Sequence, residues 1–315
     1  MLRYLTKRVM LLIGIVFVIS VGSFYLIHLL PGNPATVILG FGATPEAKAV
    51  LYKQLGLSKP IYLQYFVWLG NILHGNLGIS FISQTTVASV IRSALPIDLE
   101  IIGISQVFAF AAAIPIAMRS ARKPDGIVDR ILGAGSFTLL SIPPYILIVV
   151  LVLFISIKLG VAGTGPSAYV SGGSFFTNLE SFSLPAFTLA TGSFVIYYRV
   201  LRSDLIATLQ EEFITMARSK GLSQRRIMWR HAFRPSSVAL LGAASVNIGG
   251  LIAAGFIVQY LLQIPGLGYT LILAINSSDF LVVQGIVLTV SVLVVAINFF
   301  FDFVINVVDP RISRE

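Results

Sequence analysis

The chain has 315 residues, of which 56% are hydrophobic and only 11% are charged, and its formal net charge is +9. Because a soluble globular domain carries about a quarter charged residues, this composition excludes such a domain and indicates that apolar side chains face lipid or other apolar helices. The absence of cysteine excludes disulfides and thiolate metal sites. The three histidines, His28, His74 and His231, are far apart in sequence, so no shared metal site is expected.

Six segments meet the requirement for a membrane-spanning helix, which is about 20 mostly apolar residues. The first follows a basic N-terminus and is too long for the apolar part of a signal peptide, so it is interpreted as a retained anchor. Pro115 and the pair Pro143-Pro144 predict kinks, which serve either packing geometry or a hinge that lines a path. The six predicted spans are residues 9–30, 97–118, 131–157, 184–201, 236–260 and 281–306. They predict an all-α integral membrane protein with a single transmembrane domain, residues 1–315.

The basic residues are distributed unevenly between the loops that these spans define. An even number of spans places both termini on one side, and 17 of the 22 lysines and arginines then fall on that side. Cytoplasmic loops carry such an excess, so we predict that both termini are cytoplasmic. The same placement favours membrane lipid over nucleic acid as the partner of the positive charge. The basic residues on the outer side are Lys48, Lys53, Lys59, Arg92 and Lys158.

Residues 31–95 form the longest predicted external loop. Residues 44–57 favour a short helix, with Thr44 as its N-cap and Pro45 at its first position. Residues 61–75 are aromatic and amphipathic, which predicts a helix at the bilayer interface. This loop is therefore either an interfacial element without a substrate role or a surface that receives an external partner. Its interfacial aromatic candidates are Tyr62, Tyr65, Phe66 and Trp68.

A second external segment, residues 264–279, joins the last two spans. Turn residues precede an apolar stretch from Tyr269 to Ile275 that is too short to cross a membrane. We therefore expect a re-entrant or surface helix near the outer mouth of a path. The candidates for an external gate are Pro265, Gly266 and Tyr269.

Residues 204–235 predict a pair of short helices on the cytoplasmic side. Glu211 and Glu212 favour a helix start, Gly221 fits the position after a helix end, and Ser223 fits the N-cap of a second helix that ends at Arg234-Pro235. The pair is either a docking element or an ordinary basic loop lying on anionic headgroups. The basic side chains in and beside it are Arg199, Arg202, Arg218, Lys220, Arg225, Arg226, Arg230 and Arg234.

Motifs along the whole chain resemble those of one protein family. The run from Glu212 to Gly221, followed by Ile227, resembles the "EAA" loop of permease subunits in bacterial ABC importers, although Phe213 follows Glu212 where that loop has alanine. The remaining motifs resemble the dipeptide/oligopeptide/nickel branch. They are Ile27-His28-Leu29-Leu30-Pro31-Gly32-Asn33-Pro34, Gly75-Asn76-Leu77-Gly78 with Ser80, Pro265-Gly266-Leu267-Gly268, Asp279-Phe280-Leu281-Val282-Val283-Gln284-Gly285 and Asp309-Pro310-Arg311.

The resemblance implies the permease of an ATP-driven peptide importer in the bacterial cytoplasmic (inner) membrane, working by alternating access. Its implied partners are a similar permease subunit, two ABC ATPase subunits or domains and an extracytoplasmic substrate-binding protein. The chain itself has no phosphate-binding loop of the G-x-x-x-x-G-K-[ST] type, so it is expected to be non-catalytic, to bind no cofactor, and to leave ATP and magnesium to partner subunits. The residues implied in coupling to the ATPase are Glu212, Phe213, Ala217, Lys220, Gly221, Arg225 and Ile227.

Polar residues within the spans are candidates for the translocation path or, alternatively, for helix–helix contacts. Ser141, Asn247 and Gln259 are the path candidates. The cargo alternatives are nickel chelates, glutathione, opines and haem. Two other classes compete with an importer: a channel or membrane scaffold without energy coupling, and an intramembrane enzyme, which would need a nucleophile and a base at matching depth.

Overall fold

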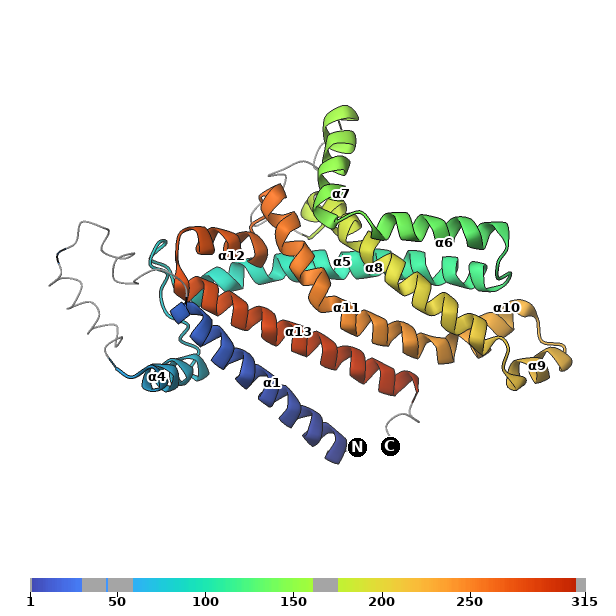
Figure 1. Ribbon diagram of the computed structural model, residues 1–315, viewed down its shortest axis with the longest axis horizontal. Coiled ribbons are helices and arrows are strands. Elements are labelled where there is room, and N and C mark those ends of the chain that lie inside the picture. The colour runs from blue at the N-terminus through green and yellow to red at the C-terminus, as the bar shows by residue number, and fades with distance from the viewer. Residues whose placement is uncertain (1, 30–43, 45–58, 161–174, 310–315) are drawn as a thin grey trace. The chain divides into compact units, whose positions relative to one another are not determined.

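The computed structural model describes residues 2–29, 44, 59–160 and 175–309. Helices form all the regular elements of these residues, apart from one isolated β-bridge between Ile79 and Thr86. The prediction of an all-α protein is confirmed (Figure 1). Apart from Thr44, the predicted short helix at 44–57 lies outside the described residues. The chain divides into two compact units, Met1–Ile97 with Pro265–Val295, and Asp98–Ile264 with Ala296–Glu315.

In the first unit, the N-terminal helix packs against the aromatic helix that was predicted at the membrane interface. The hydroxyls of Ser20 and Tyr65 lie 2.8 Å apart, and Phe24 stacks edge-on against Tyr65. Tyr65 is therefore buried in this packing, whereas Tyr62 and Phe66 on the same helix are exposed, as interfacial rings would be. The elements that lie wholly or partly in this unit are α1 (Leu2–Leu29), α4 (Ile61–Leu73), α5 (Val87–Ala121), α12 (Leu267–Asn276) and α13 (Phe280–Val308).

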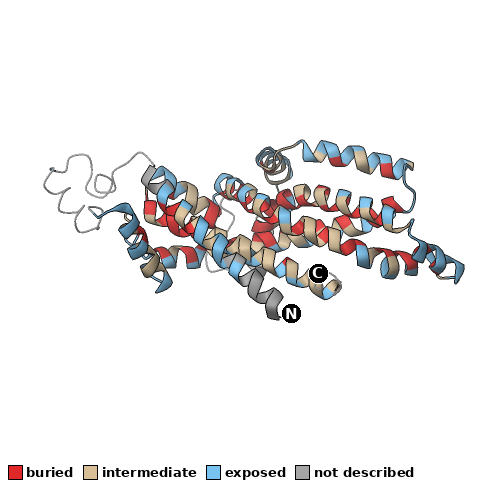
Figure 2. Ribbon diagram, turned by 60° about the horizontal axis from the view of Figure 1, so that its bottom comes forward, coloured by how far each residue is buried: buried red, intermediate tan, exposed pale blue. Residues whose placement is uncertain are grey.

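The second unit is built around the long helix α8, against which α6, α7 and α11 pack. Gly255 on α11 faces Leu189 on α8, and a Cβ atom there would lie 3.5 Å from the leucine side chain, an ordinary van der Waals distance. Buried residues run along the helices of this unit, while the α9–α10 end is largely exposed (Figure 2). Its further elements are α6 (Ile127–Leu140), α7 (Pro144–Leu151), η1 (Val152–Lys158), α8 (Phe175–Thr208), α9 (Glu212–Ser219), α10 (Gln224–Arg226), η2 (Ile227–Ala232) and α11 (Phe233–Leu262), where η denotes a π-helix.

Four helical segments in the described part of the chain are long and apolar enough to cross a membrane: 87–121, 181–208, 224–262 and 280–308. They cover four of the six predicted spans. The predicted third span is instead a pair of helices, Ile127–Leu140 and Pro144–Lys158, bent by 98°. Proline disfavours α geometry in the residue before it, so the adjacent Pro143 and Pro144 end one helix and start the next. The first predicted span falls in α1, whose described apolar segment is Ile13–Tyr25.

Pro235 behaves differently from the sequence-based expectation. Pro235 does not end the second cytoplasmic helix, because η2 continues directly into α11 and Pro235 lies in the first turn of α11. The π-helical segment η2 comes just before Pro235, and local adjustments of this kind let membrane helices re-satisfy the backbone groups that an internal proline leaves free. Pro115 lies inside the continuous helix α5, as bundles permit.

Candidate coupling surface and translocation path

The turn between α9 and α10 has the geometry that its glycine predicts. Gly221 adopts φ +76°, and its N–H donates to the carbonyl of Arg218 at 2.9 Å. The N–H of Leu222 donates to the carbonyl of Ala217 at 3.3 Å, which completes a Schellman motif. Ser223 then caps α10 by accepting the N–H of Arg226 at 3.4 Å. Both cap predictions, Gly221 and Ser223, are confirmed.

The α9–η2 pair buries one face and exposes the other. Ile214, Ala217, Ile227 and Met228 are all buried where α9 packs against η2. Two of the implied coupling residues, Ala217 and Ile227, are therefore part of the packing between α9 and η2. The other implied coupling residues lie at the surface: Glu212, Phe213, Lys220, Gly221 and Arg225.

Exposed apolar side chains distinguish this pair from a simple basic loop. Phe213 is 46% exposed, Met216 is 60% exposed and Trp229 is 48% exposed. Large apolar side chains grouped with polar neighbours on a water-facing helix pair are typical of a surface that contacts another protein or a membrane. The Trp229 ring is supported edge-on by Phe233 at a centroid distance of 5.7 Å.

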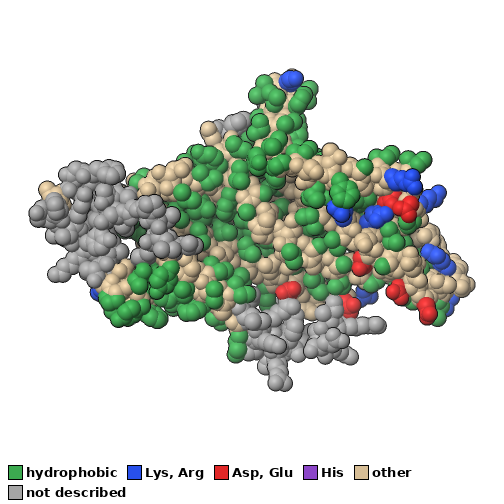
Figure 3. Space-filling view, viewed as in Figure 1, with side chains coloured by type: hydrophobic (Ala, Val, Ile, Leu, Met, Phe, Trp, Pro, Cys, Tyr) green, Lys and Arg blue, Asp and Glu red, His purple; other side chains and the backbone are tan. Residues whose placement is uncertain are grey.

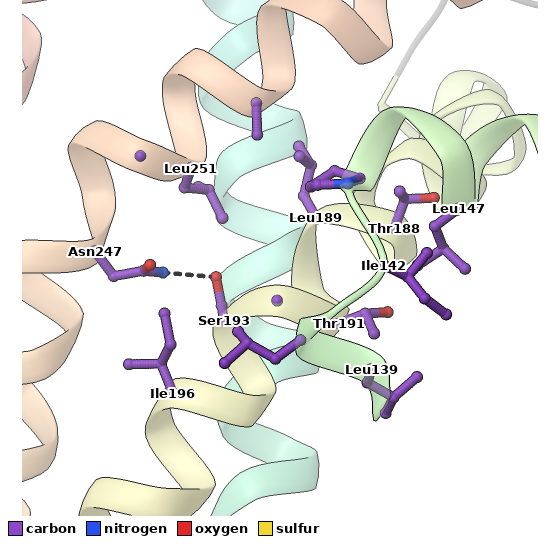
Figure 4. Close-up of a pocket in the computed structure, with 15 residues that line it drawn as sticks. Leu139, Ile142, Leu147, Thr188, Leu189, Thr191, Ser193, Ile196, Asn247 and Leu251 are labelled. Atoms are coloured by element: carbon purple, nitrogen blue, oxygen red, sulfur yellow. Dashed lines mark hydrogen bonds between the residues drawn. The ribbon is translucent and has the colours of Figure 1, made fainter. Parts of the chain in front are cut away.

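A cavity of about 160 Å³ lies between α8, α11 and the break between α6 and α7 (Figure 4). Asn247 on α11 lines it and donates through Nδ2 to the Ser193 hydroxyl on α8 at 2.8 Å. Thr188, Thr191 and Gly192 add small or polar groups from α8, and the rest of the lining is mostly aliphatic. Among the described residues, no charged side chain lines this cavity.

A polar connection extends from this cavity across three helices. The Tyr197 hydroxyl donates to the side-chain oxygen of Gln106 on α5 at 2.7 Å and lies 3.5 Å from Nδ2 of Asn247. The Tyr197 ring stacks on Phe110 at a centroid distance of 4.8 Å. The α5, α8 and α11 helices are thus joined by neutral hydrogen bonds, and Asn247 belongs both to this network and to the cavity wall.

The two other path candidates occupy different positions. Ser141 is exposed at the end of α6 and donates to the carbonyl of Phe137 in its own helix at 2.9 Å. Gln259 is buried, and its Nε2 donates to the Asp98 carboxylate at 2.9 Å. Neither lines the cavity that contains Asn247. The structure therefore does not bring the three candidates together at one site.

The external gate candidates lie at the start of α12. Gly266 is the N-cap residue, and its carbonyl accepts a hydrogen bond from the Thr270 hydroxyl at 2.8 Å. Pro265 is exposed, whereas Tyr269 is half-buried. Directly after α12, the buried Asp279 accepts a hydrogen bond from the buried Ser80. This bond joins two of the motifs that are separated by nearly 200 residues in sequence.

Comparison with known proteins identifies the family. Residues 113–314 match the family described as "Binding-protein-dependent transport system inner membrane component", and residues 1–102 match the description of its N-terminal region. The chain belongs to this family. Its multiple apolar helices agree with a multi-pass inner membrane component.

Two peptide transport permeases match this chain over 99% or more of its length and over all of their own. The dipeptide transport system permease protein DppB of Escherichia coli (strain K12) is 30% identical over 338 residues, covering all of both chains. The oligopeptide transport system permease protein AppB of Bacillus subtilis (strain 168) is 29% identical over 315 residues, covering 99% of this chain and all of the relative. The resemblance to peptide-type ABC importer permeases is confirmed.

The chain also contains a charged cluster that was not predicted from the sequence. Asp129 in the first turn of α6 forms a bidentate ion pair with Arg202 on α8. Ser120 donates to the same carboxylate, and the Asp125 N–H donates to it at 2.9 Å. The signal available in the sequence was a pair of aspartates, Asp125 and Asp129, among the basic residues of the 119–130 loop. No group of three His, Cys, Asp or Glu residues in the described ranges is arranged to hold a metal ion.

Proposed function

We propose that this chain is the permease subunit of an ATP-driven importer that moves peptides across the bacterial cytoplasmic membrane by alternating access. The observation that carries the proposal is the match to peptide transport permeases over the whole chain. On this proposal the chain works with a second permease subunit, two ABC ATPase subunits or domains and an external substrate-binding protein. ATP and magnesium are bound by the ATPases and not by this chain.

The α9–η2 pair is the proposed contact with the ATPase. Its support is the exposure of three large apolar side chains, Phe213, Met216 and Trp229, together with the exposed basic residues Lys220 and Arg225. Aromatic and methionine side chains are enriched in the centres of protein interfaces. The internal packing of Ile214 against the η2 segment would give this surface a fixed shape before it meets its partner.

The cavity at Asn247 is the proposed point where cargo contacts the chain. Its neutral polar groups and aliphatic lining suit the backbone amides and small apolar side chains of a peptide. A lining without charge offers no ion pair to a peptide terminus or a metal chelate, so selection by this cavity would be weak. The external binding protein would then do most of the selecting.

The test is transport by a reconstituted complex. The chain would be co-expressed with its proposed partners, a second permease, an ATPase and a binding protein, and placed in proteoliposomes containing ATP. Uptake of labelled di- and oligopeptides that requires both ATP and the binding protein is expected. Uptake of nickel chelates, glutathione or haem without peptide uptake would refute the proposal that the cargo is a peptide. Peptide flux that is unaffected by omission of ATP would favour an uncoupled channel.

A further inference from the structure

A second cavity, of about 390 Å³, lies between α6 and the C-terminal part of α8. Three arginines and two aspartates line it, so its formal charge is one positive. Asp129 and Arg202 are already paired with each other, and the Asp129 carboxylate accepts from Ser120 as well. Figure 3 shows basic and acidic side chains gathered at the end of this unit that carries α9 and the start of α6. We name this site the α6–α8 basic cavity.

Two of its arginines are available for a ligand. Arg130 and Arg199 are exposed, and neither forms an ion pair with a carboxylate in the described ranges. The Arg199 guanidinium lies over the Phe137 ring, 4.3 Å from its centroid. Such stacking holds the planar group while leaving its N–H donors open, and guanidinium groups bind phosphate oxygens with these donors.

Exposed apolar side chains lie on α6 with Arg130, and one of them, Phe137, also lines the cavity. Ile127 is 79% exposed, Ile131 is 65% exposed and Phe137 is 57% exposed. The helix α6 also belongs to the bent apolar pair that is long enough to enter a membrane. A soluble anion would leave this apolar surface uncovered, whereas a lipid would place its acyl chains along it. The ligand therefore combines one negative charge with hydrocarbon.

We propose that the α6–α8 basic cavity binds the phosphodiester of an anionic lipid headgroup through Arg130 and Arg199. Basic pockets between membrane helices at the cytoplasmic side bind such headgroups. The inference rests on the proposed function in one respect, which is the orientation that places the start of α6 at the inner leaflet. Lipid binding itself needs neither ATP nor cargo, so its failure and a failure of transport can be told apart.

The test measures lipid retention by the full-length chain. The chain would be reconstituted in nanodiscs of phosphatidylcholine and phosphatidylglycerol, released, and its retained lipids identified by native mass spectrometry. Preferential retention of phosphatidylglycerol is expected. Since one basic residue near a membrane surface contributes about 1 kcal/mol, Arg199→Gln should weaken retention about 5-fold, and Arg130→Gln with Arg199→Gln about 30-fold. Arg122→Gln, an exposed arginine outside the cavity, is the matched control and should have no effect.

Several results would overturn the proposal. Equal retention of the two lipids by the unmodified chain would show that the cavity does not select a negatively charged headgroup. Displacement of the lipid by millimolar glycerol phosphate would assign the cavity to a soluble phosphate. If the double variant kept its phosphatidylglycerol but lost co-purifying ATPase, the two arginines would belong to a protein contact. Circular dichroism would establish that each variant keeps its helices, and Arg199→Lys should restore part of the retention because it restores the charge.

Discussion

At the scale of single residues, the structure separates the buried residues that pack the α9–η2 pair from the exposed residues at its surface. Ala217 and Ile227 are buried inside the α9–η2 pair, whereas Gly221 is exposed in the turn beside them. A Cβ atom at Gly221 would have nothing within 4 Å in the described residues, so intrachain packing does not require glycine there. The positive φ of Gly221 favours glycine instead, because L-residues with a Cβ atom are strained in the left-handed region.

Replacing Gly221 tests whether the turn approaches a partner closely. Gly221→Trp should insert and fold but lose at least about 10-fold in ATP-driven uptake, because the ring would occupy space that the ATPase needs. Gly221→Ala carries the same backbone strain, about 1–2 kcal/mol, with little bulk, and should keep most of the uptake. Uptake would be measured in proteoliposomes with equal amounts of inserted protein. An equal loss in both variants would attribute the defect to strain and contradict the docking role.

Asn247 and Ser141 make a matched pair of polar path candidates. Asn247 lines the cavity and bonds across to Ser193, whereas Ser141 bonds only within its own helix among the contacts of the described residues. Asn247→Leu should change the KM for peptide uptake several-fold, because it removes a polar group and adds bulk to the cavity wall. Ser141→Ala should leave KM within about 2-fold. A change of KM in the Ser141→Ala variant alone would indicate that the translocation path lies elsewhere than this cavity.

At the scale of elements, helix contacts depend on a few positions where backbones approach closely. A Cβ atom at Gly285 on α13 would lie 2.5 Å from Val87 Cγ1 and 3.2 Å from Ile91 Cδ1, both at the start of α5. The neighbouring Ser80–Asp279 hydrogen bond joins the segment that precedes α5 to the turn that precedes α13. The motifs around Ser80 and Asp279 thus have a structural role in the first unit, because they hold these two helix starts together.

The contact at Gly285 can be tested by substitution and compensation. Gly285→Ala should destabilise the protein by about 1–3 kcal/mol, the usual range for overpacking, and lower the thermal unfolding midpoint in detergent. Adding Val87→Ala should recover much of that loss, since it removes the clashing methyl groups. Gly103→Ala is the control, because a Cβ atom there meets nothing within 4 Å. If the Gly285 and Gly103 variants unfolded at the same temperature, the close approach would be refuted.

The features that were predictable from sequence are the local ones. The Gly221 turn, the Ser223 cap and most span positions follow from the spacing of apolar, capping and turn residues over a few positions. The bend after α6 was only indicated by Pro143-Pro144, because its 98° angle depends on packing against other helices. The Asp129–Arg202 pair and the Gln259–Asp98 bond join residues 73 and 161 positions apart, and a single sequence contains no signal for such pairing.

At the scale of the whole molecule, orientation in the membrane connects the separate proposals. The proposed coupling surface and the proposed lipid site both require their segments to face the cytoplasm, and the six-span prediction places the Ser80 region on the outer side. The excess of basic residues in alternate loops supports this arrangement. The family description places the chain in the inner membrane but does not state the side of its termini.

The absence of cysteine makes this orientation directly measurable, because one introduced thiol would be the sole target of a maleimide. Lys123→Cys, in the exposed loop before α6, and Ser83→Cys, in the exposed segment before α5, form the matched pair. In intact cells a membrane-impermeant maleimide should label Ser83→Cys and not Lys123→Cys, and detergent permeabilisation should make both react. The opposite pattern would invert the topology, and it would place both the coupling surface and the basic cavity on the side that has no ATP.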